Sequence, residues 1–238
     1  MSKVAKLAVA LLPVAILTGC DGDAPAATQA AGTAAPTAPA EPMPVMGDPV
    51  TILAFGDSLF AGYNLGEEEG YPEVLERTLR ARGINARVID AGVSGDTTAA
   101  GRQRIGFVLD NAPARPDLAL VELGGNDLLR GIDPARTRAN LEGILQQLQQ
   151  REIPVVLMGM RAPPNLGAQY QQDFDGLYTE LARQYDTGLV PFFMEPMAND
   201  ARLIQQDRVH PTAEGVEELV RNSLGEVVDA LPDGEPAS

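Results

Sequence analysis

The sequence predicts an α/β fold in which a parallel β-sheet is covered by helices on both faces. Five short apolar runs, each bounded by Gly, Pro, Asp or Asn, are typical of buried strands. Longer segments with the spacing of amphipathic helices lie between these runs. Strands that alternate with helices favour a parallel sheet, because each crossover helix packs on a face of the sheet. Sites in such folds form at the carboxyl ends of strands, and the polar motifs of this chain follow the apolar runs.

The expected elements follow in order along residues 49–238, which we assign to one folded domain. The five apolar runs are residues 50–55, 87–91, 118–123, 155–160 and 189–193. One helix is predicted from a repeat at i, i+3, i+4 and i+7, formed by Leu141, Ile144, Leu145 and Leu148. A C-terminal helix is predicted from the similar spacing of Val216, Leu219, Val220, Leu224, Val227 and Val228. Pro134 and Pro211 lie where the first turn of a helix tolerates proline.

The segment before this domain has the features of an export signal. Residues 1–19 combine two basic residues, Lys3 and Lys6, with an apolar run at 7–17 and small residues after it. This run is shorter than the roughly 20 residues that span a bilayer, and a buried N-terminal helix is the alternative. Residues 20–48 are rich in Ala, Pro, Thr and Gly and lack hydrophobic periodicity, which predicts a flexible to semi-extended tether.

Residues 17–20, Leu-Thr-Gly-Cys, resemble the cleavage box of bacterial lipoproteins. This resemblance implies cleavage before Cys20 and acylation of its thiol and of its new amino group. More than one acyl chain holds a protein stably on a membrane. The expected location is therefore the cell envelope, as a lipoprotein that faces the periplasm. Secretion to the periplasm, with an incidental cysteine, is the alternative.

The composition excludes several classes of partner. The only lysines lie in the leader, so the mature chain would carry 16 arginines against 33 acidic residues, a formal charge of −17. Such a surface repels phosphate backbones and argues against nucleic-acid binding. It also disfavours docking on anionic lipid through a basic patch. With Cys20 as the sole cysteine, the chain has no internal disulfide. No protein partner is predicted.

The first apolar run leads into Gly56-Asp57-Ser58-Leu59, which can present a serine hydroxyl at the edge of the sheet. The pattern differs from the Gly-x-Ser-x-Gly elbow of α/β-hydrolases, because Phe60 stands where that elbow has its second glycine. By itself, Gly-Asp-Ser is also a common turn. Ser58 is therefore a candidate nucleophile whose role depends on the other motifs.

Two further motifs follow the second and third runs and can supply hydrogen-bond donors. Within residues 91–98, Gly95 lets the backbone approach a ligand with its N–H. The alternative is a loop that caps the next helix through Asp96 or Thr97. Within residues 122–127, the Asn126 amide can donate to a developing oxyanion. The alternative is a turn that favours Gly-Asn.

The chain has one histidine, His210, and any chemistry that needs an imidazole must use it. Asp207, three residues earlier, can accept the Nδ1 proton, which leaves Nε2 free as a base. The alternative is a helix N-terminus with an incidental histidine. A metal site is disfavoured, since one histidine and one lipid-bound cysteine leave only carboxylates as ligands. The order Ser58, Asp207, His210 is a known order of catalytic triads, and the four motifs together predict a serine hydrolase site.

Residues 50–230 resemble the SGNH (GDSL-type) hydrolases, and within them the bacterial group of arylesterases, acyl-CoA thioesterase I and lysophospholipases. The matching segments are ILAFGDSLFAGYNL, VSGDTTAAG, VELGGNDLLRG, VPFFME and DRVHP. The resemblance implies a flavodoxin-like, three-layer α/β/α fold with a five-stranded parallel sheet. It implies that Ser58 is the nucleophile and that Asp207 and His210 complete the triad. It also implies an oxyanion hole formed by the N–H groups of Ser58 and Gly95 and the Asn126 amide.

The same resemblance implies hydrolysis of aryl, acyl or lysophospholipid esters through an acyl-enzyme on Ser58, with no metal or cofactor. Whether the enzyme also cleaves thioesters stays open. The expected partners are a small-molecule ester and a membrane that holds the N-terminal lipid anchor. In the resembled group the loop after Asn126 lies beside the acyl-binding cleft, so Leu128 and Leu129 either contact the acyl group or pack the next helix. Two other interpretations stay open: a carbohydrate O-acetyl esterase, which the absence of Trp disfavours, and a non-catalytic envelope lipoprotein that binds a ligand in the cleft.

Overall fold

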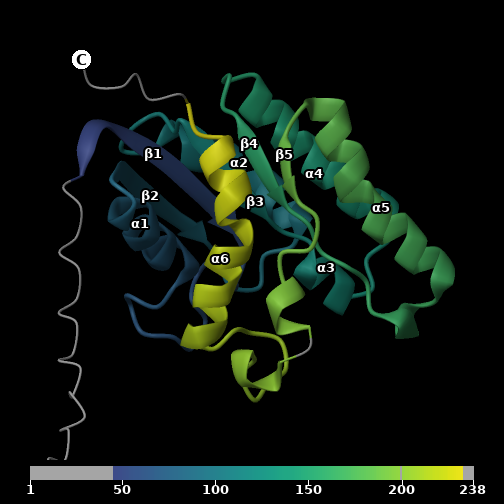
Figure 1. Cartoon of the computed structure of the whole chain (residues 1–238). Coiled ribbons are helices and arrows are strands. Elements are labelled where there is room, and N and C mark those ends of the chain that lie inside the picture. Colours follow the sequence, from purple (N-terminus) through teal and green to yellow (C-terminus); the bar gives the residue numbers. More distant parts are fainter. Residues whose placement is uncertain (1–44, 199, 233–238) are drawn as a thin grey trace, which may run out of the picture. The chain divides into compact units, whose positions relative to one another are not determined.

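The computed structural model describes residues 45–198 and 200–232. In this part of the chain, five strands form one parallel sheet in the order β2-β1-β3-β4-β5 (Figure 1). The strands are β1 (Met46–Gly56), β2 (Ile84–Gly92), β3 (Leu118–Glu122), β4 (Val155–Met158) and β5 (Gly188–Val190). The predicted five-stranded parallel sheet is therefore confirmed.

Helices cover both faces of this sheet and complete a three-layer α/β/α fold (Figure 1). The helices are α1 (Tyr71–Ala81), α2 (Thr98–Asp110), α3 (Gly125–Leu129), α4 (Pro134–Gln149), α5 (Ala168–Tyr185) and α6 (Ala213–Asp229). Helix α1 packs against α6, whereas α4 packs against both α2 and α5. Right-handed connections explain why helices lie on both faces of the sheet. The chain moves toward one edge of the sheet from β1 to β2, and toward the opposite edge from β2 to β5.

The direction in which strands are added to the sheet reverses after β2, so β1 and β3 become neighbours. The gap between these two strands is the switch point of the sheet. In the register of the sheet, Gly56 at the end of β1 pairs with Gly92 at the end of β2 and with Glu122 at the end of β3. Three strands thus finish at the same level. Loops that follow them meet at one edge, which is where open α/β sheets place their ligand sites.

The core explains why the apolar runs stand out in the sequence. Every residue of β3 and β4 is buried, because helices lie on both sides of these strands. Glu122, at the end of β3, is the one acidic residue of these two strands, and it is 0% exposed. A carboxyl group at such a position indicates a specific local role.

Element boundaries differ from the sequence predictions at several points. Strand β1 begins at Met46, so residues 46–48, assigned to the tether, belong to a strand. Strands β4 and β5 end two and three residues early; the backbone still pairs beyond them, with the Gly159 N–H donating to the Val190 carbonyl at 2.8 Å. Pro134 is the first residue of α4, as expected. The prediction for Pro211 is wrong: it precedes the N-cap Thr212 and forms a bridge with Ile204.

The leader, Cys20 and nearly all of the expected tether lie outside the described residues. Among residues 45–198 and 200–232, no helix has both the length and the apolar character that a membrane span requires.

Candidate active site

Ser58 lies on a tight turn directly after β1. The Asp57 side chain accepts the Leu59 N–H at 3.1 Å, and the Asp57 carbonyl accepts the Ala61 N–H at 3.0 Å, so the chain turns sharply. Gly92 at the end of β2 allows the turn to pack closely, since a Cβ there would clash with the Ala61 backbone. Ser58 is 8% exposed and stands at the carboxyl edge of the sheet.

A short loop before α6 holds Asp207 and His210. The Gln205 N–H donates to the His210 carbonyl at 2.8 Å and closes this loop, in which Arg208 has a left-handed φ of 61°. The Gln205 side chain also donates to the Tyr63 carbonyl at 2.9 Å, on the turn after β1. One glutamine therefore connects the histidine loop to the serine turn and limits how far the two segments can separate.

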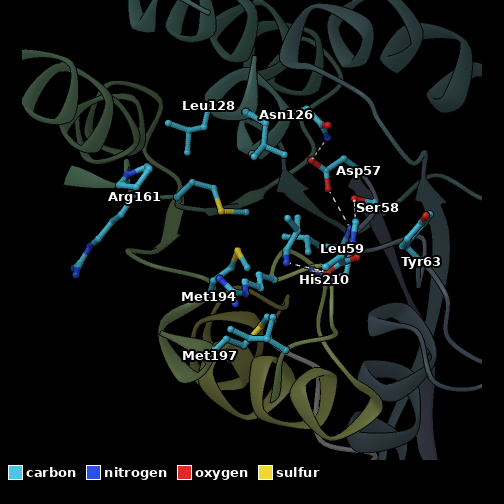
Figure 2. A pocket seen from close by; sticks show the side chains of 18 of the residues that line it. Asp57, Ser58, Leu59, Tyr63, Asn126, Leu128, Arg161, Met194, Met197 and His210 are labelled. Atoms are coloured by element: carbon cyan, nitrogen blue, oxygen red, sulfur yellow. Dashed lines mark hydrogen bonds and ion pairs between the residues drawn. The ribbon is translucent and has the colours of Figure 1, made fainter. Parts of the chain in front are cut away.

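The structure brings together the three residues predicted as a triad, of which Figure 2 labels Ser58 and His210. Ser58 Oγ lies 2.9 Å from His210 Nε2, and His210 Nδ1 lies 2.6 Å from Asp207 Oδ2. The other oxygen, Asp207 Oδ1, accepts the N–H groups of Val209 at 2.9 Å and His210 at 3.0 Å. The hydrogen bond from His210 and these backbone N–H groups lower the pKa of Asp207 to about 2. An ionised Asp207 accepts the Nδ1 proton, so Nε2 faces the serine hydroxyl as an acceptor.

The predicted oxyanion donors also lie at this edge. Gly95 has a left-handed φ of 86°, and Arg130 Nη2 donates to its carbonyl at 2.9 Å. Asn126, in the first turn of α3, donates from Nδ2 to Asp57 Oδ2 at 2.9 Å, which leaves its second amide hydrogen free. Within the described part of the chain, the N–H groups of Ser58 and Gly95 have no protein acceptor. Free donors therefore come from the ends of three neighbouring strands.

The alternative interpretation of the Gly95 motif, a helix cap, is also present. Thr97 caps α2 by accepting the Ala100 N–H at 3.3 Å, so the Gly95 loop is also a helix cap. Asp96 does not cap this helix; it forms an ion pair with Arg104 at 2.5 Å. One loop can serve both purposes, since the cap uses a side chain two residues after the glycine.

A cleft of about 870 Å³ opens at Ser58 and His210 (Figure 2). Its walls come from α3, from the segments after β4 and β5 and from the segment before α6. They are mostly apolar, with Leu128, Met160, Phe192, Met194, Met197 and Ile204 among them. Leu128 is half-buried in the wall, whereas Leu129 is 67% exposed at the rim. Neither leucine is fully buried against the next helix. Arg161 lines the cleft on the side away from Ser58, with its guanidinium 5.0 Å from the centre of the Phe192 ring.

Three contacts at the site were missed by sequence reasoning. The Tyr63 ring lies on the His210 imidazole, with 4.3 Å between the ring centres. Asp57 accepts the Asn126 amide, and Glu122 accepts the Asp57 N–H at 3.2 Å. Tyr63, Asp57 and Glu122 all belong to the matching segments quoted above. The contact between Asp57 and Glu122 depends on the register of β1 and β3, and the contact of Tyr63 depends on the position of the loop before α6. Among the described residues, no group of three or more His, Cys, Asp or Glu side chains could hold a metal ion.

Comparisons with known proteins agree with this geometry. The profile of the GDSL-like Lipase/Acylhydrolase family matches residues 54–217. Esterase TesA of Pseudomonas aeruginosa is 37% identical over 172 residues, which cover 72% of this chain and 85% of the relative. Thioesterase 1/protease 1/lysophospholipase L1 of Escherichia coli is 37% identical over 161 residues, 68% of this chain and 75% of the relative. The crystal structure of AlinE4, an SGNH-hydrolase family esterase, is 65% identical with a TM-score of 0.67, covering 79% of this chain and 99% of AlinE4.

Proposed function

Because the chain belongs to the GDSL-like lipase/acylhydrolase family and is a serine ester hydrolase of the SGNH type, we propose that Ser58 is its nucleophile, His210 its general base and Asp207 the residue that orients the base. The observation that carries the proposal is the unbroken line of contacts, 2.9 Å from Ser58 Oγ to Nε2 and 2.6 Å from Nδ1 to Asp207 Oδ2. A serine becomes a nucleophile when a base in contact takes its proton and a third group orients that base.

The proposed reaction has two halves. Nε2 of His210 takes the hydroxyl proton while Ser58 Oγ attacks the ester carbonyl, and the imidazolium then gives this proton to the leaving alcohol. The acyl group stays on Ser58. Water then enters, loses a proton to Nε2 and attacks the acyl-enzyme, which releases the acid and restores the serine. Asp207 stabilises the imidazolium in both halves, and no step uses a metal or a cofactor.

The oxyanion of each tetrahedral intermediate is proposed to bind the N–H groups of Ser58 and Gly95 and the free amide hydrogen of Asn126. These donors support the proposal because each is fixed before the reaction, Gly95 through Arg130 and Asn126 through Asp57. Preorganised donors of this kind lower the barrier, and losing one typically reduces kcat by about 10²- to 10³-fold.

The substrate class proposed is carboxylic esters with an acyl or aryl group, including lysophospholipids. The apolar cleft beside Ser58 supports this class, since its methionines adapt to acyl chains of different shape. A cleft of about 870 Å³ exceeds what an acetyl group needs, so it gives a carbohydrate O-acetyl esterase little support. The relative named a thioesterase and lysophospholipase extends the proposal to thioesters. If the purified protein cleaves aryl esters but leaves lysophospholipid intact, the lysophospholipid part is wrong.

The proposed location is the cell envelope on the periplasmic side. We propose residues 1–19 as a lipoprotein-type signal peptide, Cys20 as the lipidated residue, residues 20–45 as the tether and the chain from Met46, where β1 begins, as the hydrolase domain. In that compartment the enzyme meets envelope esters and not cytosolic acyl-CoA. Metabolic labelling with a radioactive fatty acid tests the anchor: the wild-type chain should carry label and Cys20→Ser should not. Equal labelling of both would contradict it.

The central test uses residues 45–238 and p-nitrophenyl esters of increasing acyl length. Ser58→Ala should lower kcat by at least about 10³-fold, because the nucleophile is lost. Ser223→Ala is the matched control, since it removes another buried serine hydroxyl, one that contacts Tyr71 away from the cleft. It should keep kcat. Full activity of Ser58→Ala would disprove the assignment of the nucleophile.

A further inference from the structure

Behind the proposed oxyanion donors lies a pair of buried carboxyl groups. Asp57 is 2% exposed and Glu122 is 0% exposed, and they occupy the ends of the adjacent strands β1 and β3. Glu122 Oε2 accepts the Asp57 N–H at 3.2 Å. A Cβ on Gly56 would lie 2.9 Å from the same oxygen, so the carboxyl group of Glu122 packs flat against this glycine. Glu122 therefore supports the serine turn from the core side.

Asp57 in turn holds the side chain of Asn126. Its Oδ1 accepts the Leu59 N–H at 3.1 Å, and its Oδ2 accepts the Asn126 side-chain N–H at 2.9 Å. Both oxygens of Asp57 are thus held by donors, as suits a carboxylate. The contact with Asp57 fixes one amide hydrogen of Asn126 and aims the other away, so the orientation of Asn126 depends on the position of Asp57.

The surroundings of Glu122 do not support a second negative charge. Its Oε1 is fully buried and has no hydrogen-bond partner among the described residues. The titratable groups that face it are Asp57, Tyr71 of α1 and Tyr178 of α5, none of which is a cation. Both phenol groups are engaged elsewhere, Tyr71 with Ser223 and Tyr178 with the Leu123 carbonyl. A buried charge without a counter-charge is costly, whereas a neutral acid is tolerated.

The pKa shifts of the two carboxyl groups agree with a neutral Glu122. Burial raises the pKa of Glu122 well above its usual range, and the nearby charge of Asp57 raises it further. Burial also raises the pKa of Asp57, but hydrogen bonds from Leu59 and Asn126 oppose the rise. Only the hydrogen bond from the Asp57 N–H opposes the rise at Glu122, which favours the proton on Glu122 and the negative charge on Asp57.

We propose that Glu122, as a neutral carboxylic acid, is a positioning residue: it holds Asp57 in place, and Asp57 in turn keeps the Asn126 amide aimed at the oxyanion. The inference rests on the proposed function, because it takes Asn126 as an oxyanion donor. Glu122 lies behind the turn and does not touch substrate. It contributes to catalysis only through Asn126.

Two substitutions of Glu122 distinguish the effect of its size from the effect of its hydrogen bond to Asp57. Glutamine has the size of Glu122, an oxygen that accepts the Asp57 N–H and, like a neutral carboxylic acid, a hydrogen-bond donor. Glu122→Gln should therefore keep kcat within about threefold. Leucine keeps the bulk but removes the acceptor, so Glu122→Leu should lower kcat by about tenfold with KM unchanged. Val121→Ala, a buried change in the same strand, is the control for general destabilisation and should keep kcat.

A double-mutant cycle with Asn126→Ala is the decisive measurement. If Glu122 acts through Asn126, then Glu122→Leu should change kcat by less than about twofold once the Asn126 amide is gone. Equal losses in both backgrounds would overturn the proposal, and so would a Glu122→Gln variant as slow as Glu122→Leu. If Glu122 only stabilised the fold, Glu122→Leu would lower kcat by the same factor with and without the Asn126 amide.

A second readout does not depend on folding of the leucine variant. Glutamine cannot ionise, so the ratio of kcat between the wild type and Glu122→Gln should stay constant from about pH 5 to about pH 9 if Glu122 is already neutral. A ratio that changes across this range overturns the proposal. Failure of the proposed function is distinguishable, because Ser58→Ala would then keep its activity or Asn126→Ala would leave kcat unchanged.

Discussion

At the scale of single residues, Asp207 contacts both the ring and the backbone of His210. It accepts the Nδ1 proton at 2.6 Å and is itself held by two backbone N–H groups. We predict that Asp207→Asn lowers kcat by about 10³- to 10⁴-fold, because an amide no longer selects the tautomer with a free Nε2 or stabilises the imidazolium. Steady-state kinetics on a p-nitrophenyl ester checks this. A loss below tenfold would mean that the histidine is oriented by other contacts.

The same carboxylate connects stability to pH. The pKa of Asp207 in the folded protein, about 2, lies below the usual 3.8, so the folded state binds this proton more weakly than the unfolded state does. Its contribution to stability is therefore complete above about pH 5 and is lost as the pH falls through 4 toward 2. The free energy of unfolding should differ between the wild type and Asp207→Asn at about pH 5 by a small amount. This difference should shrink below about pH 4 in urea titrations, and one that grows on acidification contradicts the prediction.

Tyr63 offers a milder test at the same histidine. Its ring lies 4.3 Å from the imidazole and is 43% exposed, so it can stabilise the imidazolium through its π face. An exposed contact of this kind is worth about 0.5–1 kcal/mol, so Tyr63→Ala should lower kcat about two- to fivefold. Tyr63→Phe keeps the ring and serves as the control. If the phenylalanine variant loses as much as the alanine variant, the hydroxyl and not the ring is responsible.

At the scale of elements, Asp127 joins three helices around the site. Its side chain, on α3, accepts the Thr98 N–H at 2.8 Å, the Thr98 hydroxyl at 2.5 Å and the Thr137 hydroxyl at 3.1 Å, from α2 and α4. Asp127→Ala leaves buried donors unpaired, and we predict a loss of about 2–4 kcal/mol in the free energy of unfolding. Asp133→Ala, which removes an exposed helix cap, should cost only about 1 kcal/mol. Urea denaturation compares the two, and equal losses would contradict the prediction.

The elements that could be predicted from sequence are those with a strong period or a long apolar run. All five strands and the helices around residues 141–148 and 216–228 fall in this class. The extension of β1 to Met46 could not be predicted, because Gly47, Asp48 and Pro49 are exposed and form no apolar pattern. Pro211 was misplaced because a proline before a helix suits both the first turn and the residue before the cap; its bridge to Ile204 depends on tertiary contact.

At the scale of the whole molecule, the site follows from the strand order. Short motifs at positions 58, 95 and 126 could be predicted as site residues, because the ends of parallel strands meet at one edge. The carboxyl pair of Asp57 and Glu122 could not, because it depends on which strands are adjacent and on their register. The methionines of the cleft could not be predicted either, since they come from segments that are distant in sequence from Ser58 and Leu128. Local patterns therefore predict the reacting groups, and topology adds the residues that position them.

The charge of the whole chain leads to a last prediction. Residues 45–238 carry 16 arginines against 30 acidic residues, a formal charge of −14, so the folded domain repels itself. Salt screens this repulsion as the Debye length falls from about 30 Å at 0.01 M to about 8 Å at 0.15 M. The Tm of residues 45–238 at pH 7 should therefore rise as NaCl increases over this range. The isoelectric pH of the chain, about 4.4, provides the control, because the net repulsion vanishes there. The salt dependence at that pH should be flat. The same rise at both pH values would show that salt acts on apolar burial and not on the charge of the molecule.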